Sequence, residues 1–389
     1  MGLKTLAVAA LMVAGTAFAE TTINIKGSGA EQYIVSIDVQ GNPEFAKTLR
    51  RNLELSGAFR VEANAPIRVH GTTGGAITVE GPVDGLNRRL TMTSQATEPR
   101  QVRREARNLS DKMCEAFAKQ KGFANDMIAF VAKTGKVEEL CVGYADGADV
   151  RQLTQDRRAS VGPRWKNAST LYYTGYLNDA PQVFEIDVTT GKRQLAYAYG
   201  GLTTGATVSP DGSRAAIILS KPFGNPELCL INPASGTWSR LTTTKTASEG
   251  QPSWSPDGKK IVYVSNESRR QHLYIIDVAT KEKRRLTSSG SRNNDPDWGG
   301  DGRIVYTTGR GGQNQIAVIS PAEGESSVRL VTAPGTWEHP TWARDRRHVI
   351  AERDGALFLI DTLDQDGKPT PPVKLFTIGA KCITPSWCR

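Results

Sequence analysis

The chain has 389 residues, of which 23% are charged and 7% aromatic, and its formal net charge is +9. This length allows two domains, and the composition excludes a disordered chain. The positive charge does not indicate nucleic-acid binding, because it is spread along the chain rather than gathered in one stripe: residues 20–121 carry 15 Lys and Arg against 12 Asp and Glu.

The first 19 residues have the pattern of a secretory signal. Lys4 supplies a positive start, residues 6–14 form an apolar run too short to cross a bilayer, and Ala17-Phe18-Ala19 is a small-residue cleavage site. We expect cleavage after Ala19 and export to a soluble extracytoplasmic space. Neither a lipid-acceptor cysteine in residues 3–11 nor a later span of membrane length is found in the sequence.

Residues 20–121 predict a small α/β domain. Apolar spacing indicates strands at residues 23–25, 34–37, 67–70, 76–80 and 89–94, and helices at residues 43–56 and 100–121. The second helix carries Arg100, Arg103, Arg104 and Arg107, which we interpret as a solvated face rather than a site for an acidic partner. Gly122-Phe123 marks the passage to the next domain, residues 122–389.

Residues 122–389 contain six copies of a short pattern spaced 43 to 46 residues apart. The copies are Gly162-Pro163-Arg164-Trp165, Gly205-Ala206-Thr207-Val208, Gln251-Pro252-Ser253-Trp254, Asp295-Pro296-Asp297-Trp298, His339-Pro340-Thr341-Trp342 and Thr384-Pro385-Ser386-Trp387. Each repeat has four strand signals, with turns such as Ser255-Pro256-Asp257-Gly258 between them. This period predicts a mainly β fold, a six-bladed β-propeller preceded by the small α/β domain.

The two ends of the repeat region predict how the ring closes. Residues 126–132, 138–144 and 150–154 supply three strands of a blade that lacks an inner strand, and residues 383–388 form an inner strand without a blade. Joining them completes blade one and leaves no free sheet edge. We expect the repeated Trp residues to pack between blades, because both faces of each blade are covered by neighbours.

The five cysteines leave at least one thiol unpaired. Cys141 and Cys229 occupy the same repeat position, on the third strand of two blades, and are interpreted as core thiols. Cys382 and Cys388 flank the final strand, and their pairing stays open, as does that of Cys114 on a helix. CxxC spacing does not occur, which argues against redox or zinc chemistry.

The sequence offers no constellation typical of an enzyme. Histidine is scarce, and the chain has no HExxH motif, no GxSxG elbow and no phosphate-binding glycine loop followed by Lys. We expect no catalytic residue, no cofactor and no metal. The strongest candidates lie on the loops that enter the inner strands and open at one mouth of the channel, and we expect them to be exposed and to capture a protein: Thr203, Thr204, Ser248, Glu249, Arg292, Asn293, Asn294, Glu338 and His339.

Simpler interpretations of single members of this set stay open. His339 fits a solvated histidine equally well, and Asp295 with Asp297 fits residues that trim a strand edge. A metal or sugar-lyase site would need several histidines or carboxylates near the channel axis.

The segment from Trp254 to Ile261, with Leu273-Tyr274-Ile275-Ile276-Asp277 and Arg285-Leu286-Thr287, is similar to the blades of the TolB family of Tol-Pal systems. The order of signal, α/β domain and six blades extends this resemblance over nearly the whole mature chain. The resemblance implies a non-catalytic, monomeric periplasmic adaptor that supports outer-membrane invagination during division and envelope integrity. An alternative is a propeller lyase or hydrolase acting on envelope polymers, and a third is a structural scaffold.

The resemblance also implies two partners. The peptidoglycan-associated lipoprotein Pal, or a protein like it, would bind at the mouth through Ser248, Glu249, Asn293, Asn294, Glu338 and His339. A TolA-like inner-membrane protein would bind the mature N-terminal segment, which comprises Glu20, Thr21, Thr22, Ile23, Asn24 and Ile25.

Overall fold

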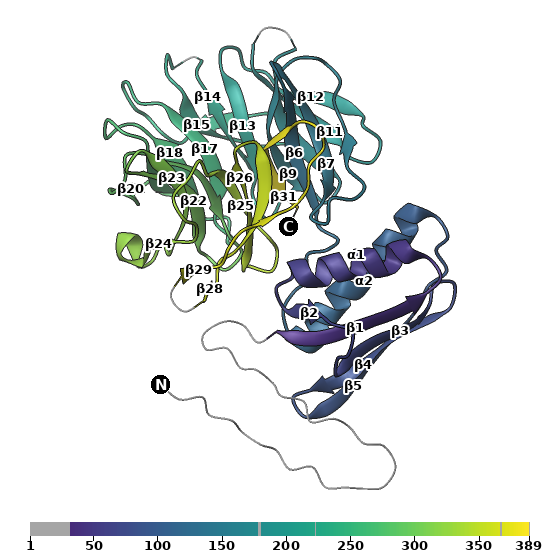
Figure 1. Ribbon diagram of the computed structural model, residues 1–389. Helices are drawn as coiled ribbons and strands as arrows, with labels where there is room; N and C mark the ends of the chain where they lie inside the picture. The colour runs from purple at the N-terminus through teal and green to yellow at the C-terminus, as the bar shows by residue number, and fades with distance from the viewer. Residues whose placement is uncertain (1–31, 178–179, 222, 366–367, 389) are drawn as a thin grey trace, which may run out of the picture.

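The computed structural model describes residues 32–177, 180–221, 223–365 and 368–388 (Figure 1). The expected signal peptide, residues 1–19, and the segment Glu20–Ile25 expected to bind a TolA-like protein lie outside the described residues. The strand expected at residues 23–25 also lies outside them.

The first region is a sheet covered on one face by two helices. Its elements are β1 (Tyr33–Gln40), α1 (Pro43–Leu55), β2 (Phe59–Val61), β3 (Ile67–Thr72), β4 (Ala76–Val83), β5 (Leu86–Thr93) and α2 (Pro99–Ala118). The strand order is β2-β1-β3-β4-β5, with β1 parallel to both of its neighbours. The sequence pattern missed the three-residue β2, and α2 ends at Ala118 rather than residue 121 because Lys119 adopts a left-handed conformation.

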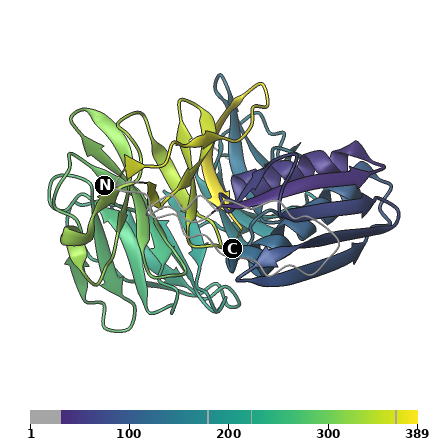
Figure 2. The same ribbon diagram turned by 60° about the horizontal axis from the view of Figure 1, so that its bottom comes forward.

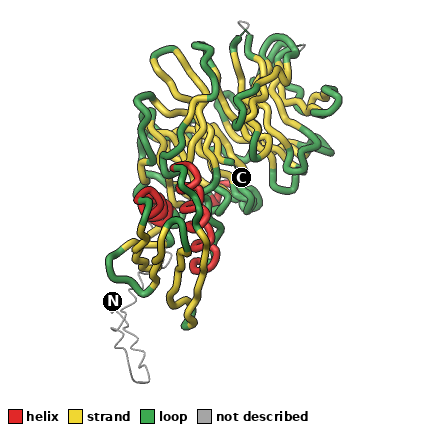
Figure 3. Tube along the Cα trace, turned by 90° about the vertical axis from the view of Figure 1, so that its right-hand side faces the viewer, coloured by secondary structure: helices red, strands yellow, loops and turns green. Residues whose placement is uncertain are grey.

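Local sequence and packing explain this region. Asn42 caps α1 by accepting a hydrogen bond from the Glu44 N–H, and Pro43 follows as the first helical residue. Apolar side chains of both helices, among them Phe45, Leu49, Val102 and Phe117, join the sheet in one buried cluster. Figure 3 shows the helices on the side of the sheet that faces the second region.

The second region is a ring of six four-stranded sheets within the described residues, a six-bladed propeller. From the inner strand outward, blade one holds β31 (Lys381–Trp387), β6 (Met127–Thr134), β7 (Val137–Tyr144) and β8 (Arg151–Gln152); blade two β9 (Ser160–Asn167), β10 (Thr170–Gly175), β11 (Gln182–Asp187) and β12 (Arg193–Tyr197); blade three β13 (Thr203–Val208), β14 (Ala215–Leu219), β15 (Glu227–Ile231) and β16 (Trp238–Arg240). Blade four holds β17 (Glu249–Trp254), β18 (Lys260–Ser265), β19 (His272–Asp277) and β20 (Lys283–Arg285); blade five β21 (Asn293–Trp298), β22 (Ile304–Arg310), β23 (Gln313–Ile319) and β24 (Arg329–Leu330); blade six β25 (Glu338–Trp342), β26 (His348–Arg353), β27 (Ala356–Asp361) and β30 (Val373–Lys374). A 3-10 turn, η1 (Gly324–Ser327), precedes β24, and a small hairpin of β28 (Asp364–Gln365) and β29 (Lys368–Pro369) precedes β30.

The ring closes as the sequence predicts. β31 pairs antiparallel with β6, from Lys381 opposite Lys133 to Trp387 opposite Ile128. Because β31 completes blade one, the edge of β6 that faces the channel is covered.

The repeated tryptophans pack between blades, as expected. Trp254 lies in one cluster with Ala216 and Ile218 of blade three, and its indole N–H donates to the Thr207 carbonyl 3.0 Å away. The Trp165 indole N–H donates in the same way to the Ser386 carbonyl of blade one at 2.9 Å. These two indoles therefore tie their own inner strands to the blade before them, whereas the Trp298 indole donates to the Gly302 carbonyl of its own blade at 3.0 Å.

The cysteines of the third strands are core residues. Cys141 on β7 and Cys229 on β15 are both buried, and burial raises the pKa of each thiol to about 12. Cys382 lies within β31 and is a free thiol, so it forms no disulfide with Cys388; Cys114 is likewise a free thiol, buried on α2.

The α/β region docks against one end of the propeller (Figure 2). Arg107 of α2 has 1% of its side chain exposed, forms ion pairs with Asp146 at 2.8 Å and Asp149 at 3.1 Å, and lies over the Tyr144 ring. Arg103 also pairs with Asp149. Arg100, which is largely exposed, pairs with the same Asp149 at 3.8 Å. The expectation of a fully solvated arginine face on α2 is therefore wrong, because three of its four arginines pair with the loop after β7.

Candidate partner-binding mouth of the propeller channel

The end of the channel opposite the α/β region opens into a cavity of about 610 Å³. Inner strands begin at this end and second strands turn into third strands there, and these loops lie at the top of Figure 1. The lining comes from blades five, six and one: Lys133, Ser291, Arg292, Gly312, Gln313, Asn314, Gly335, Thr336, Glu338, His339, Glu352, Asp354, Gly355, Lys381 and Ile383.

Polar side chains of this cavity are held in place by one another. Arg292 of the loop before β21 forms an ion pair with Glu338 at 2.8 Å, and the Asn314 amide donates to the same carboxylate at 3.1 Å. These contacts join blades five and six across their junction. The side chains are thus oriented before any partner arrives, which lowers the entropy lost on binding.

His339 lies at the floor of the mouth between two carboxylates. Its Nδ1 is 3.1 Å from Glu352 Oε2, and its Nε2 is 3.7 Å from Asp295 Oδ1. Burial alone would lower the pKa of His339, but Asp295 and Glu352 outweigh burial and raise it above the ordinary histidine value. His339 therefore carries positive charge to higher pH than a solvated histidine does, and it is not simply a solvated side chain.

The structure brings some of the predicted residues together and buries others. Arg292, Glu338 and His339 line the cavity. Thr204 and Asn294 are half-buried near the start of β13 and β21, and Ser248 is exposed just before β17, but none of these three is among the lining residues.

Three predicted contact residues are buried, so the expectation that they are exposed at the mouth is wrong. Thr203, Glu249 and Asn293 have 0%, 4% and 1% of their surface exposed. Each is the first residue of an inner strand rather than a loop residue, and its side chain is buried. Glu249 lies opposite Ser265 in the sheet, and burial raises the pKa of its carboxyl to about 7. Asn293 donates to the Ser289 carbonyl at 2.8 Å.

Sequence reasoning missed a ring of residues that share a left-handed backbone. The residue before the Pro or Ala of each repeated pattern has φ between 46° and 70°, and these residues are Gly162, Gly205, Gln251, Asp295, His339 and Thr384. The strand register shifts at the same point in all six blades, which is a β-bulge. The glycines in two copies were the sequence signal for this conformation.

In blade five the residue with the left-handed backbone, Asp295, links neighbouring blades along the channel. The Asp295 N–H donates to Gln251 Oε1 at 2.9 Å, the Gln251 amide donates back to Asp295 Oδ1, and the Thr307 hydroxyl donates to Asp295 Oδ2 at 3.2 Å. Asp295 therefore joins blades four, five and six through its own contacts and those of His339, and does not merely trim a strand edge.

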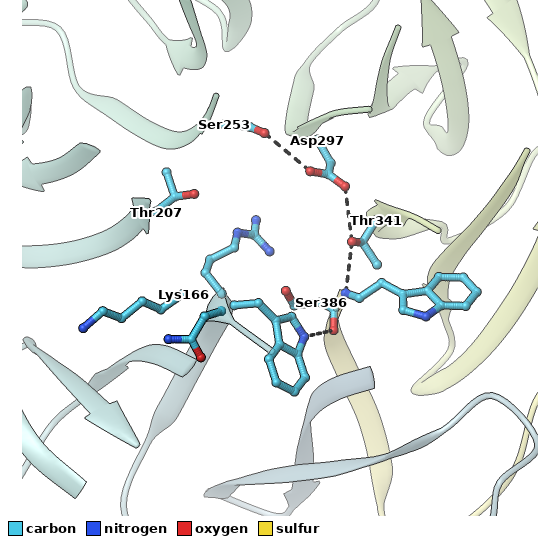
Figure 4. A pocket seen from close by; sticks show the side chains of 10 residues that line it. Lys166, Thr207, Ser253, Asp297, Thr341 and Ser386 are labelled. Atoms are coloured by element: carbon cyan, nitrogen blue, oxygen red, sulfur yellow. Dashed lines mark hydrogen bonds between the residues drawn. The ribbon is translucent and has the colours of Figure 1, made fainter. Parts of the chain in front are cut away.

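A second ring lies at the other end of the channel, around a cavity of about 140 Å³ (Figure 4). Its members stand immediately before the Trp position of each repeat: Arg164, Thr207, Ser253, Asp297, Thr341 and Ser386. Asp297 accepts from the Thr341 hydroxyl at 3.2 Å and from the Trp342 N–H at 2.8 Å. The carboxylate thereby fixes blade five to blade six.

Within the ranges that the structure describes, no group of three or more His, Cys, Asp or Glu side chains is placed to hold a metal ion. Among the same residues, none of the helices is long and apolar enough to span a bilayer.

The fold and the mouth define a class of protein, a six-bladed propeller with an α/β region docked at one end of its channel and a polar cavity at the other. A family profile described as the TolB beta propeller domain matches residues 114–389, and the chain belongs to this family. The Tol-Pal system protein TolB of Chromobacterium violaceum is 27% identical over 235 residues, which cover 51% of this chain and 54% of that relative. The chain thus matches about half the length of this relative.

Solved structures agree with the fold. TolB from Acinetobacter baumannii superposes with a TM-score of 0.78 over 93% of this chain and 98% of its own, at 20% identity. A putative TolB from Agrobacterium tumefaciens gives 0.52 over 67% of this chain and 92% of its own, also at 20% identity. A chain of the nidogen/laminin complex gives 0.55 at 8% identity, over 68% of this chain and 98% of its own. At these identities the structural likeness shows the fold alone.

Proposed function

We propose that the chain is a non-catalytic, monomeric periplasmic adaptor of a Tol-Pal system. It binds a Pal-like peptidoglycan-associated lipoprotein at the mouth cavity of the propeller, and a TolA-like inner-membrane protein through the segment Glu20–Ile25. Through these contacts it supports outer-membrane invagination during division and envelope integrity. Residues 1–19 act as the signal peptide, residues 20–121 form one domain and residues 122–389 the propeller.

The observation that carries the proposal is the open, preorganised mouth. The cavity of about 610 Å³ lies at the end of the propeller that the α/β region leaves free, and ion pairs such as Arg292–Glu338 hold its side chains in place. Family membership supports the proposal, since the relative from Chromobacterium violaceum is a Tol-Pal system protein. The described residues supply no observation that favours a lyase or hydrolase.

Calorimetry with the mature protein and the soluble domain of the Pal-like lipoprotein from the same genome tests the first contact. We expect the Arg292→Ala/Glu338→Ala double variant to bind at least about tenfold more weakly, a loss of about 1.4 kcal/mol, because the ion pair lines the cavity. A matched control, Lys192→Ala/Glu282→Ala, removes one exposed cation and one exposed anion at the other end of the blades and should change binding less than about twofold. Unchanged binding by the first variant would exclude this mouth as the site.

The second contact has its own test. Deleting residues 20–25 should abolish binding to the TolA-like domain and leave lipoprotein binding intact. Retained TolA-like binding by the deletion variant would move that contact to another surface.

A further inference from the structure

Positive charge gathers on what we call the mouth surface, which comprises the loops between second and third strands and the loops leading into the inner strands. Exposed cations are spread around it with no carboxylate within ion-pair distance among the described residues: Lys136, Lys221, Lys245, Arg269, Arg270, Arg310 and Lys381. They come from blades one, three, four and five, or from loops entering them.

The carboxylates of the mouth surface, by contrast, are already paired. Within the described residues, Glu138 binds Lys133 at 2.6 Å and Glu338 binds Arg292 at 2.8 Å, while Asp156 pairs with Arg193 and Glu267 with Lys283. Glu352 contacts His339, and Asp354 contacts Arg353 and the Thr336 hydroxyl. Negative charge is therefore neutralised locally, and a surplus of positive charge remains.

The opposite end of the blades shows no such surplus. Its tight turns alternate acidic and basic residues, and the aspartates accept hydrogen bonds from N–H groups of their own turns. Examples are Asp211 with Ser213 N–H at 3.1 Å, Asp257 with Lys259 N–H at 3.1 Å and Asp301 with Arg303 N–H at 3.1 Å. The charge asymmetry is thus a property of the mouth end and not of the whole chain.

Two features favour a protein over a uniformly anionic polymer as the ligand. The cavity wall mixes cations with the paired carboxylates of Glu338, Glu352 and Asp354, whose remaining acceptor positions suit the hydrogen-bond donors of a protein surface and not a continuous polyanion. Ile383 adds an apolar contact, and Arg353 is held over the buried Trp337 ring at 5.2 Å. A protein surface that is mainly acidic and partly mixed complements this arrangement.

We propose that the mouth surface receives an acidic surface of a folded protein partner, whose Asp and Glu side chains pair with the cations around the cavity. This rests on the proposed function, and it specifies the chemistry of the lipoprotein face that docks there. Single exposed ion pairs contribute little to affinity. A surface whose charges share one sign, however, raises the association rate with an oppositely charged partner and makes that rate depend on salt concentration. The association rate is therefore the quantity that this surface controls.

Stopped-flow association with the soluble lipoprotein domain, from about 50 to 500 mM NaCl, tests the inference. We expect the wild-type rate to fall steeply with salt. The Arg310→Glu/Lys381→Glu variant should associate at least about tenfold more slowly at low salt. The matched control, Lys192→Glu/Lys259→Glu at the opposite end, makes the same charge change and should slow association less than about threefold. Thermal melting of both variants checks that they fold alike.

The outcomes separate this inference from the function on which it rests. If wild type binds the lipoprotein, but its association rate does not change with salt and the mouth variant associates as fast as the control variant, the acidic-partner inference is overturned and the adaptor proposal stands. If wild type does not bind the lipoprotein, both fall. Binding of wild type to phosphatidylglycerol vesicles that only the mouth variant loses, with lipoprotein association unchanged, would assign the charge to a lipid surface and overturn the inference.

Discussion

The two ends of the propeller channel are built from the same repeat but differ in how their charged groups are used. At the end facing the α/β region, turn aspartates such as Asp211 bind their own backbone, and Arg107 is buried against Asp146 and Asp149. At the mouth, paired carboxylates line a cavity and a surplus of cations stays exposed. Charged groups at the first end therefore stabilise the fold, while those at the mouth stay available for the contact with a partner that we propose.

The largest effect is expected at the stabilising end, from Trp387→Ala. Trp387 has 2% of its surface exposed and packs in one cluster with Leu55 of α1, Phe123 and blade six. Losing it should cost about 3–5 kcal/mol of unfolding free energy. Urea unfolding measures this loss, and Leu86→Ala, at a residue 68% exposed, should shift stability by less than about 0.5 kcal/mol. Equal effects of the two changes would contradict the closure role of β31.

Arg107→Ala should have the next largest effect, a loss of about 3 kcal/mol of unfolding free energy, because it leaves Asp146 buried without its cation. Arg107→Lys should not restore stability, since an ammonium group cannot pair with both carboxylates and stack on Tyr144 in the same geometry. Differential scanning calorimetry should show the α/β transition moving to lower temperature. Full rescue by Lys would mean that charge alone, and not the fork geometry, holds the two regions together.

A smaller change, a gain rather than a loss of unfolding free energy, is expected from Glu249→Gln at the mouth end. Burial raises the pKa of Glu249 to about 7, above its unfolded value, so the folded state binds a proton that the unfolded state has lost. Stability should therefore fall as pH rises from about 4.5 to 7 and stay reduced above that. Glu249→Gln should leave stability nearly unchanged at pH 4 and raise it by about 2 kcal/mol at pH 8. A variant equally stable or less stable than wild type at pH 8 would contradict this burial effect.

Much of the propeller could be predicted from the sequence, because the same strand and turn signals recur in every repeat. The repeat of about 44 residues predicted six four-stranded blades and identified the last strand, β31, as the missing strand of blade one. Turn residues and alternating apolar positions are local signals, and each copy reinforces the others.

The candidate site was less predictable, because burial depends on how neighbouring blades approach one another. Thr203 and Asn293 resemble loop residues in the sequence, yet each is the buried first residue of an inner strand. Arg107 and Arg100 look alike in the sequence and both pair with the loop after β7, yet the Arg107 side chain is buried and that of Arg100 is exposed. The residue with a left-handed backbone in each inner strand could not be recognised from the sequence, because its residue type changes from repeat to repeat, from Gly162 to His339.

The pairing of β31 with β6 also sets an order of events during synthesis. Lys133 leaves the ribosome long before Lys381, so blade one waits with an unpaired edge while every other blade is made. The ring can close only after translation has passed Trp387. Until then β6 exposes a row of hydrogen-bonding groups that other chains can join, so the incomplete propeller is the stage at which this protein most needs a chaperone.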